Sequence, residues 1–429
     1  MKKKSLNVIT LGCSKNLVDS ERILGQLPAG KFKLSHDADG PSDIVIINTC
    51  GFIKDAKEES INTILQYVEA KKQGLVEEVI ITGCLSQRYK EELQKEIPEA
   101  DAWFGAREPD ELFEYLSQRY SRESGKRYLT TPTHFAYLKI AEGCDRTCSF
   151  CAIPMIRGAF RSRSIVSLVE EAKDLAAKGV KELLLVAQDL SYYGYDLHRK
   201  SMLAPLLEEL SNIDGIEWIR LHYAYPKNFP EDVIPQMAMN PKICRYLDIP
   251  VQHISDRLLK AMRRGHDKKG TLQLLEKFRR QIPGVALRTT LLVGFPGETR
   301  EEFQELLDFV KLARFERLGV FNYSPEEGTS AYQLGDPIPE KEKQRRAAEL
   351  MELQAEISGA LNDEKIGKTF KVLIDREEGE YFIGRTEFDS PEVDNEVLVE
   401  NAPGLKPGAF ANVLITSATD FELFGKLIS

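Results

Sequence analysis

Apolar runs in the first 130 residues are short and β-branched, and longer stretches with a mixed charged face separate them. Three of these runs each end in a cysteine: residues 8–13, 43–50 and 79–84. Helix-like stretches cover residues 18–27 and 56–72. Strand–helix alternation of this kind predicts a parallel sheet with right-handed crossovers. We therefore expect an N-terminal parallel α/β domain over residues 1–130.

The middle of the chain, residues 131–365, alternates in the same way after a polar linker at residues 121–126. The strand candidates are residues 135–141, 182–186, 218–221, 245–249, 285–288 and 318–321. The helix candidates are residues 166–177, 203–210, 256–262, 272–280 and 300–312. These make about six βα units, which is short of a full eight-stranded barrel. A long charged helix at residues 340–362 then leads to the last part of the chain.

The pattern changes after residue 366 to short alternating strands with little helical periodicity. The candidates are residues 369–374, 381–385, 396–399 and 411–415. Turn residues such as Pro403-Gly404 and Pro407-Gly408 lie between them. Short strands punctuated by such turns predict a small antiparallel β-barrel over residues 366–429.

Three cysteines fall within eight residues, Cys144, Cys148 and Cys151, on a loop that follows the strand candidate at residues 135–141. Iron–sulfur clusters are normally held by four thiolates, so three thiolates leave one iron open to another ligand. A zinc site is the alternative, but structural zinc sites close with four ligands, and no fourth Cys or His is near in the sequence.

Cys13, Cys50 and Cys84 each follow a predicted strand of the N-terminal sheet. The carboxyl ends of parallel strands share one edge, so these side chains should converge there. Single buried core cysteines are common, which is the simpler interpretation of each one alone. Three at equivalent strand ends favour a second three-cysteine cluster. Cys244, in an apolar run, is interpreted as a core residue.

The sequence Cys144-Asp-Arg-Thr-Cys148-Ser-Phe150-Cys151 resembles the signature of radical S-adenosylmethionine enzymes. That resemblance implies a partial (β/α)6 barrel and a [4Fe–4S] cluster whose open iron chelates S-adenosylmethionine. The reduced cluster then cleaves it to a 5′-deoxyadenosyl radical. Phe150 would belong to the cofactor site. At the strand ends, Arg288 would bind the carboxylate of S-adenosylmethionine and Gln188 its ribose, because an arginine fork matches a carboxylate.

Three further segments resemble the N-terminal domain of methylthiotransferases: residues 11–21, 48–52 and 82–85. In that family Cys13, Cys50 and Cys84 would hold an auxiliary [4Fe–4S] cluster that supplies sulfur. Residues 15–21 resemble the branch that modifies an aspartate of a small-subunit ribosomal protein, although Ser14 stands where that branch more often has proline. The C-terminal barrel resembles a TRAM domain. The implied reaction converts the aspartate to its β-methylthio derivative and consumes two S-adenosylmethionine molecules and electrons from an external reductant.

Charge and composition limit the kinds of partner that this protein is expected to bind. The formal net charge is −9, and residues 366–429 contain twelve acidic and six basic residues, a net of −6. An acidic barrel should repel nucleic-acid phosphates and attract a Lys/Arg-rich ribosomal protein. No apolar run approaches a membrane span. Seven cysteines, an odd number, fit a reducing cytoplasm. We therefore expect a cytoplasmic enzyme with a ribosomal-protein substrate and an electron-donor protein, and with no membrane or tRNA partner.

Two alternatives remain at this stage. The first is a tRNA adenosine methylthiotransferase, which predicts a basic C-terminal barrel that this chain lacks. The second is an iron–sulfur electron-transfer or cluster-carrier protein, which predicts no strand-end site for S-adenosylmethionine and no cleavage of it.

Overall fold

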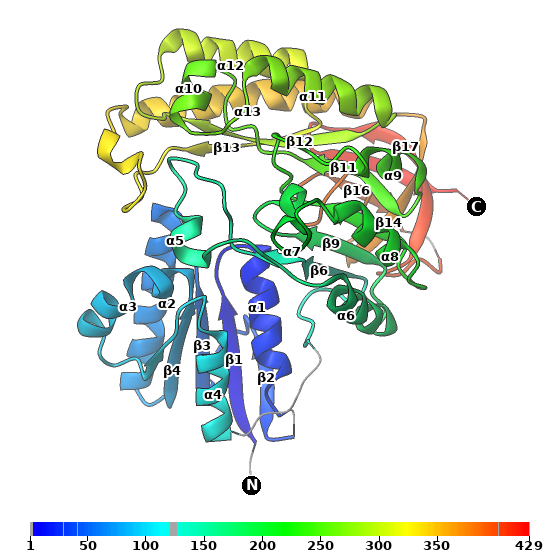
Figure 1. Cartoon of the computed structure of the whole chain (residues 1–429). Coiled ribbons are helices and arrows are strands. Elements are labelled where there is room, and N and C mark those ends of the chain that lie inside the picture. Colours follow the sequence, from blue (N-terminus) through cyan, green and yellow to red (C-terminus); the bar gives the residue numbers. More distant parts are fainter. Residues whose placement is uncertain (1–2, 29, 41, 121–126, 402, 429) are drawn as a thin grey trace.

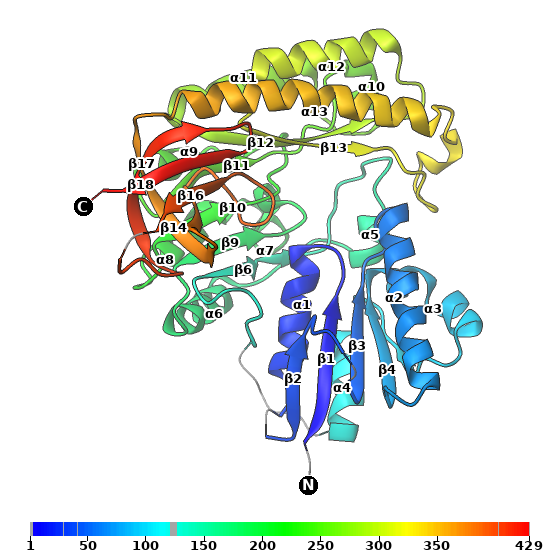
Figure 2. The ribbon, with the colours of Figure 1, turned by 180° about the vertical axis from the view of Figure 1, so that it is seen from behind.

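The computed structural model describes residues 3–28, 30–40, 42–120, 127–401 and 403–428. Figures 1 and 2 show three consecutive units: an N-terminal sheet, a central sheet and a C-terminal barrel. The expected linker at residues 121–126 lies outside the described residues. Within them, no helix combines the length and the apolar character that crossing a membrane requires. The α/β fold class predicted from the sequence is confirmed.

The N-terminal sheet, in the described residues, has five parallel strands in the order β2-β1-β3-β4-β5. They are β1 (Lys4–Thr10), β2 (Phe32–His36), β3 (Ile44–Thr49), β4 (Glu78–Gly83) and β5 (Ala102–Trp103). The helices are α1 (Ser14–Gly25), α2 (Lys54–Lys72), α3 (Cys84–Glu96) and α4 (Pro109–Tyr120). The strand order reverses between β1 and β3, and such a reversal opens a crevice at the carboxyl ends of the strands.

Alternation along β3 explains why helices cover both faces of this sheet. Ile44 and Ile46 pack with α1 and α4, whereas Val45 and Ile47 pack with α2 and α3. The sequence predicted β1, β3 and β4 but not β2 and β5, which lie at the two edges. Helix α1 begins at Ser14 rather than at residue 18, because its polar first turn is used in contacts with the strand ends.

The central sheet has parallel strands that stand in chain order, β13-β12-β11-β10-β9-β6, and it does not close. They are β6 (Phe135–Lys139), β9 (Glu182–Val186), β10 (Trp218–Leu221), β11 (Ile243–Asp248), β12 (Ala286–Val293) and β13 (Arg317–Asn322). Helices cover its outer face: α6 (Ile165–Ala177), α8 (Leu203–Ser211), α9 (Val233–Met239), α10 (Asp256–Ala261), α11 (Lys268–Gln281) and α12 (Arg300–Ala313). The six strands predicted for this region are therefore confirmed as an open, partial barrel.

Short elements follow several central strands. They are β7 (Ala141–Glu142), α5 (Ile153–Arg157), β8 (Arg161–Ser162), the 3₁₀ turn η1 (Leu190–Tyr192), α7 (Tyr195–His198) and the 3₁₀ turn η2 (Tyr332–Leu334). Helix α13 (Glu340–Asp363) runs along β13 and leads into the C-terminal barrel (Figure 2). It is the long connecting helix that the sequence predicted.

The C-terminal barrel is closed in the order β14-β15-β16-β18-β17. Its strands are β14 (Thr369–Glu378), β15 (Tyr381–Arg385), β16 (Glu396–Glu400), β17 (Phe410–Ala418) and β18 (Glu422–Leu427). Its pairings are antiparallel except that β16 pairs with β18 in parallel. The sequence predicted the barrel but missed β18, which buries little beyond Leu423 and Gly425.

The barrel covers the inner face of the central sheet. Leu373, Phe388 and Phe410 of the barrel unit pack against Trp218 and Tyr246 of the sheet. Buried ion pairs flank this apolar contact. Glu182 pairs with Arg220 at 2.7 Å and with Arg385 at 2.8 Å, and Arg385 also pairs with Asp375 at 2.7 Å. Each charge is matched, which is the condition under which buried ions are tolerated. Cys244 is buried in the same apolar cluster, as the sequence predicted.

Candidate metal centres

Cys13, Cys50 and Cys84, here called the N-terminal cysteine site, all lie at the carboxyl ends of adjacent strands. Cys13 follows β1, Cys50 follows β3, and Cys84 is the first residue of α3 directly after β4. Glycine keeps the space between them open: a Cβ on Gly12, whose φ is +92°, would lie 2.7 Å from Cys50 Cβ and 2.8 Å from its Sγ. The convergence expected from the sequence is confirmed.

Two polar side chains hold the backbone of this site. The Ser60 hydroxyl donates to the Cys50 carbonyl at 2.8 Å and accepts from the Cys50 N–H at 3.0 Å. The Asn16 amide donates to the carbonyls of Leu11 at 2.8 Å and Thr49 at 3.1 Å. Asn16 Oδ1 accepts from Cys84 Sγ at 3.6 Å. The three strand ends are thus tied together by buried hydrogen bonds.

Positive charge lies beside these thiols. Desolvation raises the pKa of the Cys13 thiol, but the charges of Lys15 and Arg157 and the backbone N–H groups of Asn16 and Lys15 together outweigh it, so the net shift of the pKa is downward. Burial raises the pKa of the Cys50 thiol to about 12 and also raises that of Cys84, where Arg157 acts in the opposite direction. The thiolate is the metal ligand, so binding iron here must release protons, and nearby cations favour that release.

Cys144, Cys148 and Cys151, here called the loop cysteine site, lie on one turn between β7 and α5. Gly143 allows the turn, because a Cβ there would come within 2.1 Å of the Ala159 carbonyl oxygen. The loop is fixed by backbone hydrogen bonds from Cys144 N–H to Gly158, from Ser149 N–H to Met262 and from Ala331 N–H to Ser149. The three thiols line a cavity of about 520 Å³.

Arginines surround the loop cysteine site. Arg264 donates to Cys148 Sγ at 3.3 Å. Arg146 pairs with the buried Asp189 at 2.8 Å. Arg146 and Arg264 both stack on the ring of Tyr225, with their guanidinium carbons 4.1 Å and 4.4 Å from the ring centre, respectively. Burial raises the pKa of the Cys144 thiol to about 11 and that of Cys151 to about 12. Cationic donors to sulfur are among the features that set the potential of an iron–sulfur cluster.

Both sites fit a cluster with one open iron. Each offers three thiols, the type of ligand that iron–sulfur clusters use. Among the described residues, no three His, Cys, Asp or Glu side chains are placed to hold one metal ion. Three ligands to different irons of one cluster do not need to meet at a single point.

The structure shows which side chains surround the other residues predicted to bind S-adenosylmethionine. Phe150 packs behind the loop with Leu258 and Phe295. Gln188 follows β9 and donates to Glu142 at 3.4 Å, while its buried Oε1 has no hydrogen-bond partner within the described residues. Arg288 is paired with Asp248 at 3.2 Å and with Asp394 of the barrel unit at 3.4 Å. Their roles toward S-adenosylmethionine stay predictions.

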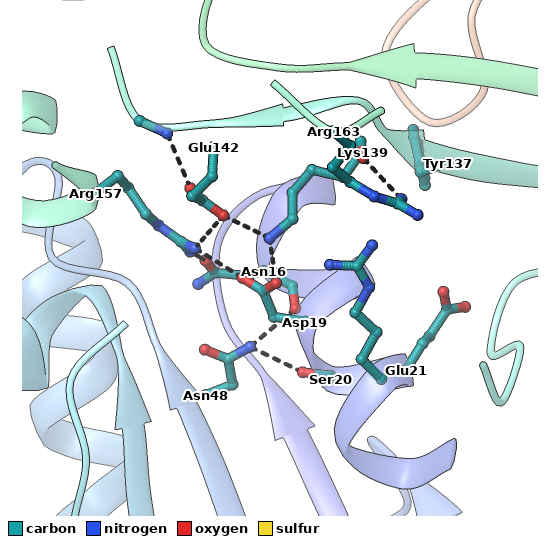
Figure 3. Close-up of polar contacts among 12 residues, drawn as sticks. Asn16, Asp19, Ser20, Glu21, Asn48, Tyr137, Lys139, Glu142, Arg157 and Arg163 are labelled. Atoms are coloured by element: carbon teal, nitrogen blue, oxygen red, sulfur yellow. Dashed lines mark hydrogen bonds and ion pairs between the residues drawn. The ribbon is translucent and has the colours of Figure 1, made fainter. Parts of the chain in front are cut away.

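Figure 3 shows the polar interface that joins α1 to the central unit, beside the N-terminal cysteine site. Arg157, at the end of α5, donates to Asn16 Oδ1 and pairs with Asp19 of α1 at 2.7 Å. Lys139 pairs with the same Asp19 and with Glu142 at 2.6 Å. Sequence reasoning missed the roles of Asn16 and Arg264, because only the fold brings them to the cysteines.

A second contact holds the other side of this interface. Glu326, on the loop after β13, pairs with Lys57 of α2 at 2.9 Å and with Arg88 of α3 at 2.7 Å. Gly328, Thr329 and Ser330 of the same loop line the cavity of the loop cysteine site. The N-terminal unit therefore contacts the loop that forms part of the wall of that cavity.

Comparison with known families agrees with this architecture. Residues 5–105 match the model of the uncharacterized protein family UPF0004, residues 138–310 match the radical SAM superfamily, and residues 366–428 match the TRAM domain. Among solved structures, the radical S-adenosylmethionine methyltransferase TsrM from Kitasatospora setae aligns with a TM-score of 0.54 and 14% identity, over 74% of this chain and 73% of that one. The fold is that of a radical SAM enzyme.

Curated relatives define the family more narrowly. A protein of Christiangramia forsetii named ribosomal protein uS12 methylthiotransferase RimO is 58% identical over 99% of this chain and 95% of its own length. Proteins of the same name from Flavobacterium johnsoniae and Phocaeicola vulgatus are 55% and 52% identical, over 99% and 100% of this chain and 98% and 100% of their own lengths. The chain belongs to the RimO family of radical SAM methylthiotransferases.

Proposed function

We propose that this enzyme converts an aspartate of ribosomal protein uS12 to its β-methylthio derivative, using two [4Fe–4S] clusters and S-adenosylmethionine. Family membership supports the reaction. The loop cysteine site would hold the cluster that binds S-adenosylmethionine, and the N-terminal cysteine site would hold the auxiliary cluster. These cofactors supply the hydrogen-abstracting chemistry that an unactivated Cβ–H requires. Two molecules of S-adenosylmethionine and an external electron donor complete the reaction.

The observation that carries this assignment is the shared interface between two three-thiol sites. Asn16 contacts Cys84 on one side and Arg157 on the other, and Arg157 ends the helix that follows Cys151. A transferase needs both centres to act on one substrate, so their relative position must be fixed. An electron carrier would need no cavity beside its cluster thiols, whereas the loop cysteine site lines one of about 520 Å³.

The rest of the chain would bind the cofactor and the partner. We propose that Phe150, Gln188 and Arg288 contribute to the S-adenosylmethionine site, with the free Oε1 of Gln188 as one acceptor. For Arg288 this requires sharing its guanidinium with Asp248 and Asp394. We divide the chain into functional units at residues 1–130, 131–365 and 366–429. A ribosomal-protein substrate and free thiols support a cytoplasmic location.

The acidic barrel would receive the basic ribosomal protein. Several of its carboxylates are already used inside the molecule, where Asp375, Asp389 and Asp394 pair with arginines. Glu392 and Glu422 line a cavity of about 450 Å³ between the barrel and the start of the central unit, beside Glu396, which pairs with Arg376 at 2.6 Å. Glu392 and Glu422 are the carboxylates that we expect to meet lysine and arginine side chains of uS12, in a salt-sensitive encounter.

A substrate competition tests the proposal. The enzyme is reconstituted anaerobically with iron and sulfide, then given a reductant, S-adenosylmethionine, uS12 and unmodified tRNA together. Mass spectrometry should find the methylthio group on an aspartate of uS12. Methylthio groups on tRNA adenosine instead would transfer the assignment to the tRNA-modifying branch. Formation of 5′-deoxyadenosine with no modified macromolecule would leave the cofactor chemistry standing and refute uS12 as the substrate.

A further inference from the structure

Arg157 belongs to the central unit but ends beside the thiols of the N-terminal unit. It is the last residue of α5 and follows Cys151 of the loop cysteine site by six positions. Its side chain is buried, with 2% of its surface exposed. One branch of the guanidinium pairs with Asp19 at 2.7 Å, and the other donates to Asn16 Oδ1, the atom that accepts from Cys84 Sγ. A single oxygen atom therefore separates the guanidinium from a thiol.

The charge of Arg157 reaches the N-terminal cysteine site through Asn16. The Asn16 amide also donates to the carbonyls of Leu11 and Thr49, so the guanidinium is held against the strand ends that carry Cys13 and Cys50. Arginine stays protonated in proteins, so this cation is permanent. Asp19 and Glu142 hold it from the far side, at 2.7 Å and 3.4 Å. The buried guanidinium is thus fixed in place with its charge directed at the thiols.

We propose that Arg157 is a positioning residue that raises the reduction potential of the auxiliary cluster. The inference rests on the proposed function, in which Cys13, Cys50 and Cys84 hold that cluster. Reduction adds negative charge to a cluster, and a nearby cation stabilises the more negative state. The cation comes from the helix that follows the other cluster's last ligand. The loop of one centre therefore tunes the electron affinity of the other.

Arg127 offers a matched control for Arg157. If Arg157 served only to join the two units, replacing either arginine should have the same effect on the cluster. Arg127 is also buried, and it also joins α1 to the central unit, through Glu21 and through Glu171 at 3.1 Å. Within the described residues, the Arg127 side chain makes no hydrogen bond or ion pair with a cysteine or with Asn16. Loss of Arg127 therefore removes an ion pair of the same interface without removing charge from the thiols.

The test is a redox titration of the full chain in which Cys144, Cys148 and Cys151 are replaced by Ala. Only the auxiliary cluster can then give a redox signal. The protein is reconstituted anaerobically, and cluster reduction is followed by absorbance and electron paramagnetic resonance. Arg157→Gln should lower the midpoint potential, Arg157→Lys should lower it less because the charge remains, and Arg127→Gln should leave it unchanged. Asp19→Asn should raise it, because a nearby negative charge is lost.

Three outcomes would overturn the proposal: an unchanged potential in Arg157→Gln, an equal shift in Arg127→Gln, or a downward shift in Asp19→Asn. If Arg157→Gln does not retain iron, Arg157→Lys and Asp19→Asn decide the matter by the sign of their shifts. If the parent protein with three alanines binds no iron, the ligand assignment of the proposed function fails, and this inference fails with it. Failure of the ligand assignment is therefore seen as loss of iron, whereas failure of the role given to Arg157 is seen in the midpoint potentials.

Discussion

The N-terminal cysteine site takes its three thiols from a span of 72 residues, whereas the loop cysteine site takes its three from eight. The first site exists only when β1, β3 and β4 lie side by side, since each strand end carries one cysteine. The second needs one turn and a few backbone hydrogen bonds, in which the carbonyls of Met262 and Gly158 accept and the N–H of Ala331 donates. Closing long loops costs more entropy than closing short ones. The auxiliary site should therefore depend more strongly on the integrity of its unit.

Removing one cysteine from each site should give the largest and most separable effects. Cys84→Ala should abolish methylthio transfer and remove about half of the bound iron, if each site holds one four-iron cluster. Cleavage of S-adenosylmethionine should persist. Cys148→Ala should abolish cleavage and transfer together. Iron analysis, 5′-deoxyadenosine and modified uS12 are measured on the same preparations. Persistent transfer in Cys84→Ala would show that the N-terminal cysteines are not required.

Gly12→Ala should break the auxiliary site while leaving the loop cysteine site intact. The new Cβ would lie 2.7 Å from Cys50 Cβ, so the strand ends cannot keep their spacing. The positive φ adds about 1–2 kcal/mol of backbone strain. Gly74→Ala is the matched control, because Gly74 also has a positive φ but nothing within 4 Å of its Cβ position. Both variants should lose unfolding free energy, but only Gly12→Ala should lose auxiliary iron. Equal iron retention in both would contradict the role given to Gly12.

Local sequence patterns predicted the elements that carry the cysteines because those strands are apolar on both faces. Residues 44–47 and 183–186 are continuous apolar runs, and both lie in buried strands of the structure. The missed strands β2, β5 and β18 are edge, very short or half-exposed elements, so they lack that pattern. For these, pairing with a neighbour rather than the local sequence decides the conformation.

The supporting residues of the sites could not be predicted in the same way. Arg157 meets Asn16 across 141 positions, and Arg264 meets Cys148 across 116. No local pattern encodes such pairs, because they depend on how two units dock. Arg288 illustrates the converse: its place on a strand was predictable, but its ion pair with Asp394 comes from the barrel unit.

The smallest predicted effect on bound iron concerns two buried serines, one beside each site. Ser60 satisfies both backbone groups of Cys50 through its hydroxyl, whereas the Ser149 hydroxyl is buried without a hydrogen-bond partner in the described part of the chain. Ser60→Ala leaves buried backbone groups unpaired and should lower the unfolding free energy by about 1–3 kcal/mol. Ser149→Ala should be close to neutral, because the loop is held by the backbone of Ser149.

Iron loss to a chelator measures how each serine supports its cluster. Ser60→Ala should release auxiliary iron faster than the parent protein, with the loop site protected to the same extent as before. Ser149→Ala should show parent rates at both sites. Faster release from the loop site in Ser149→Ala would mean that its hydroxyl supports the cluster through a contact formed only when iron is bound. The two cysteine sites would then differ less in how their surroundings support the cluster than the contacts of Ser60 and Ser149 indicate.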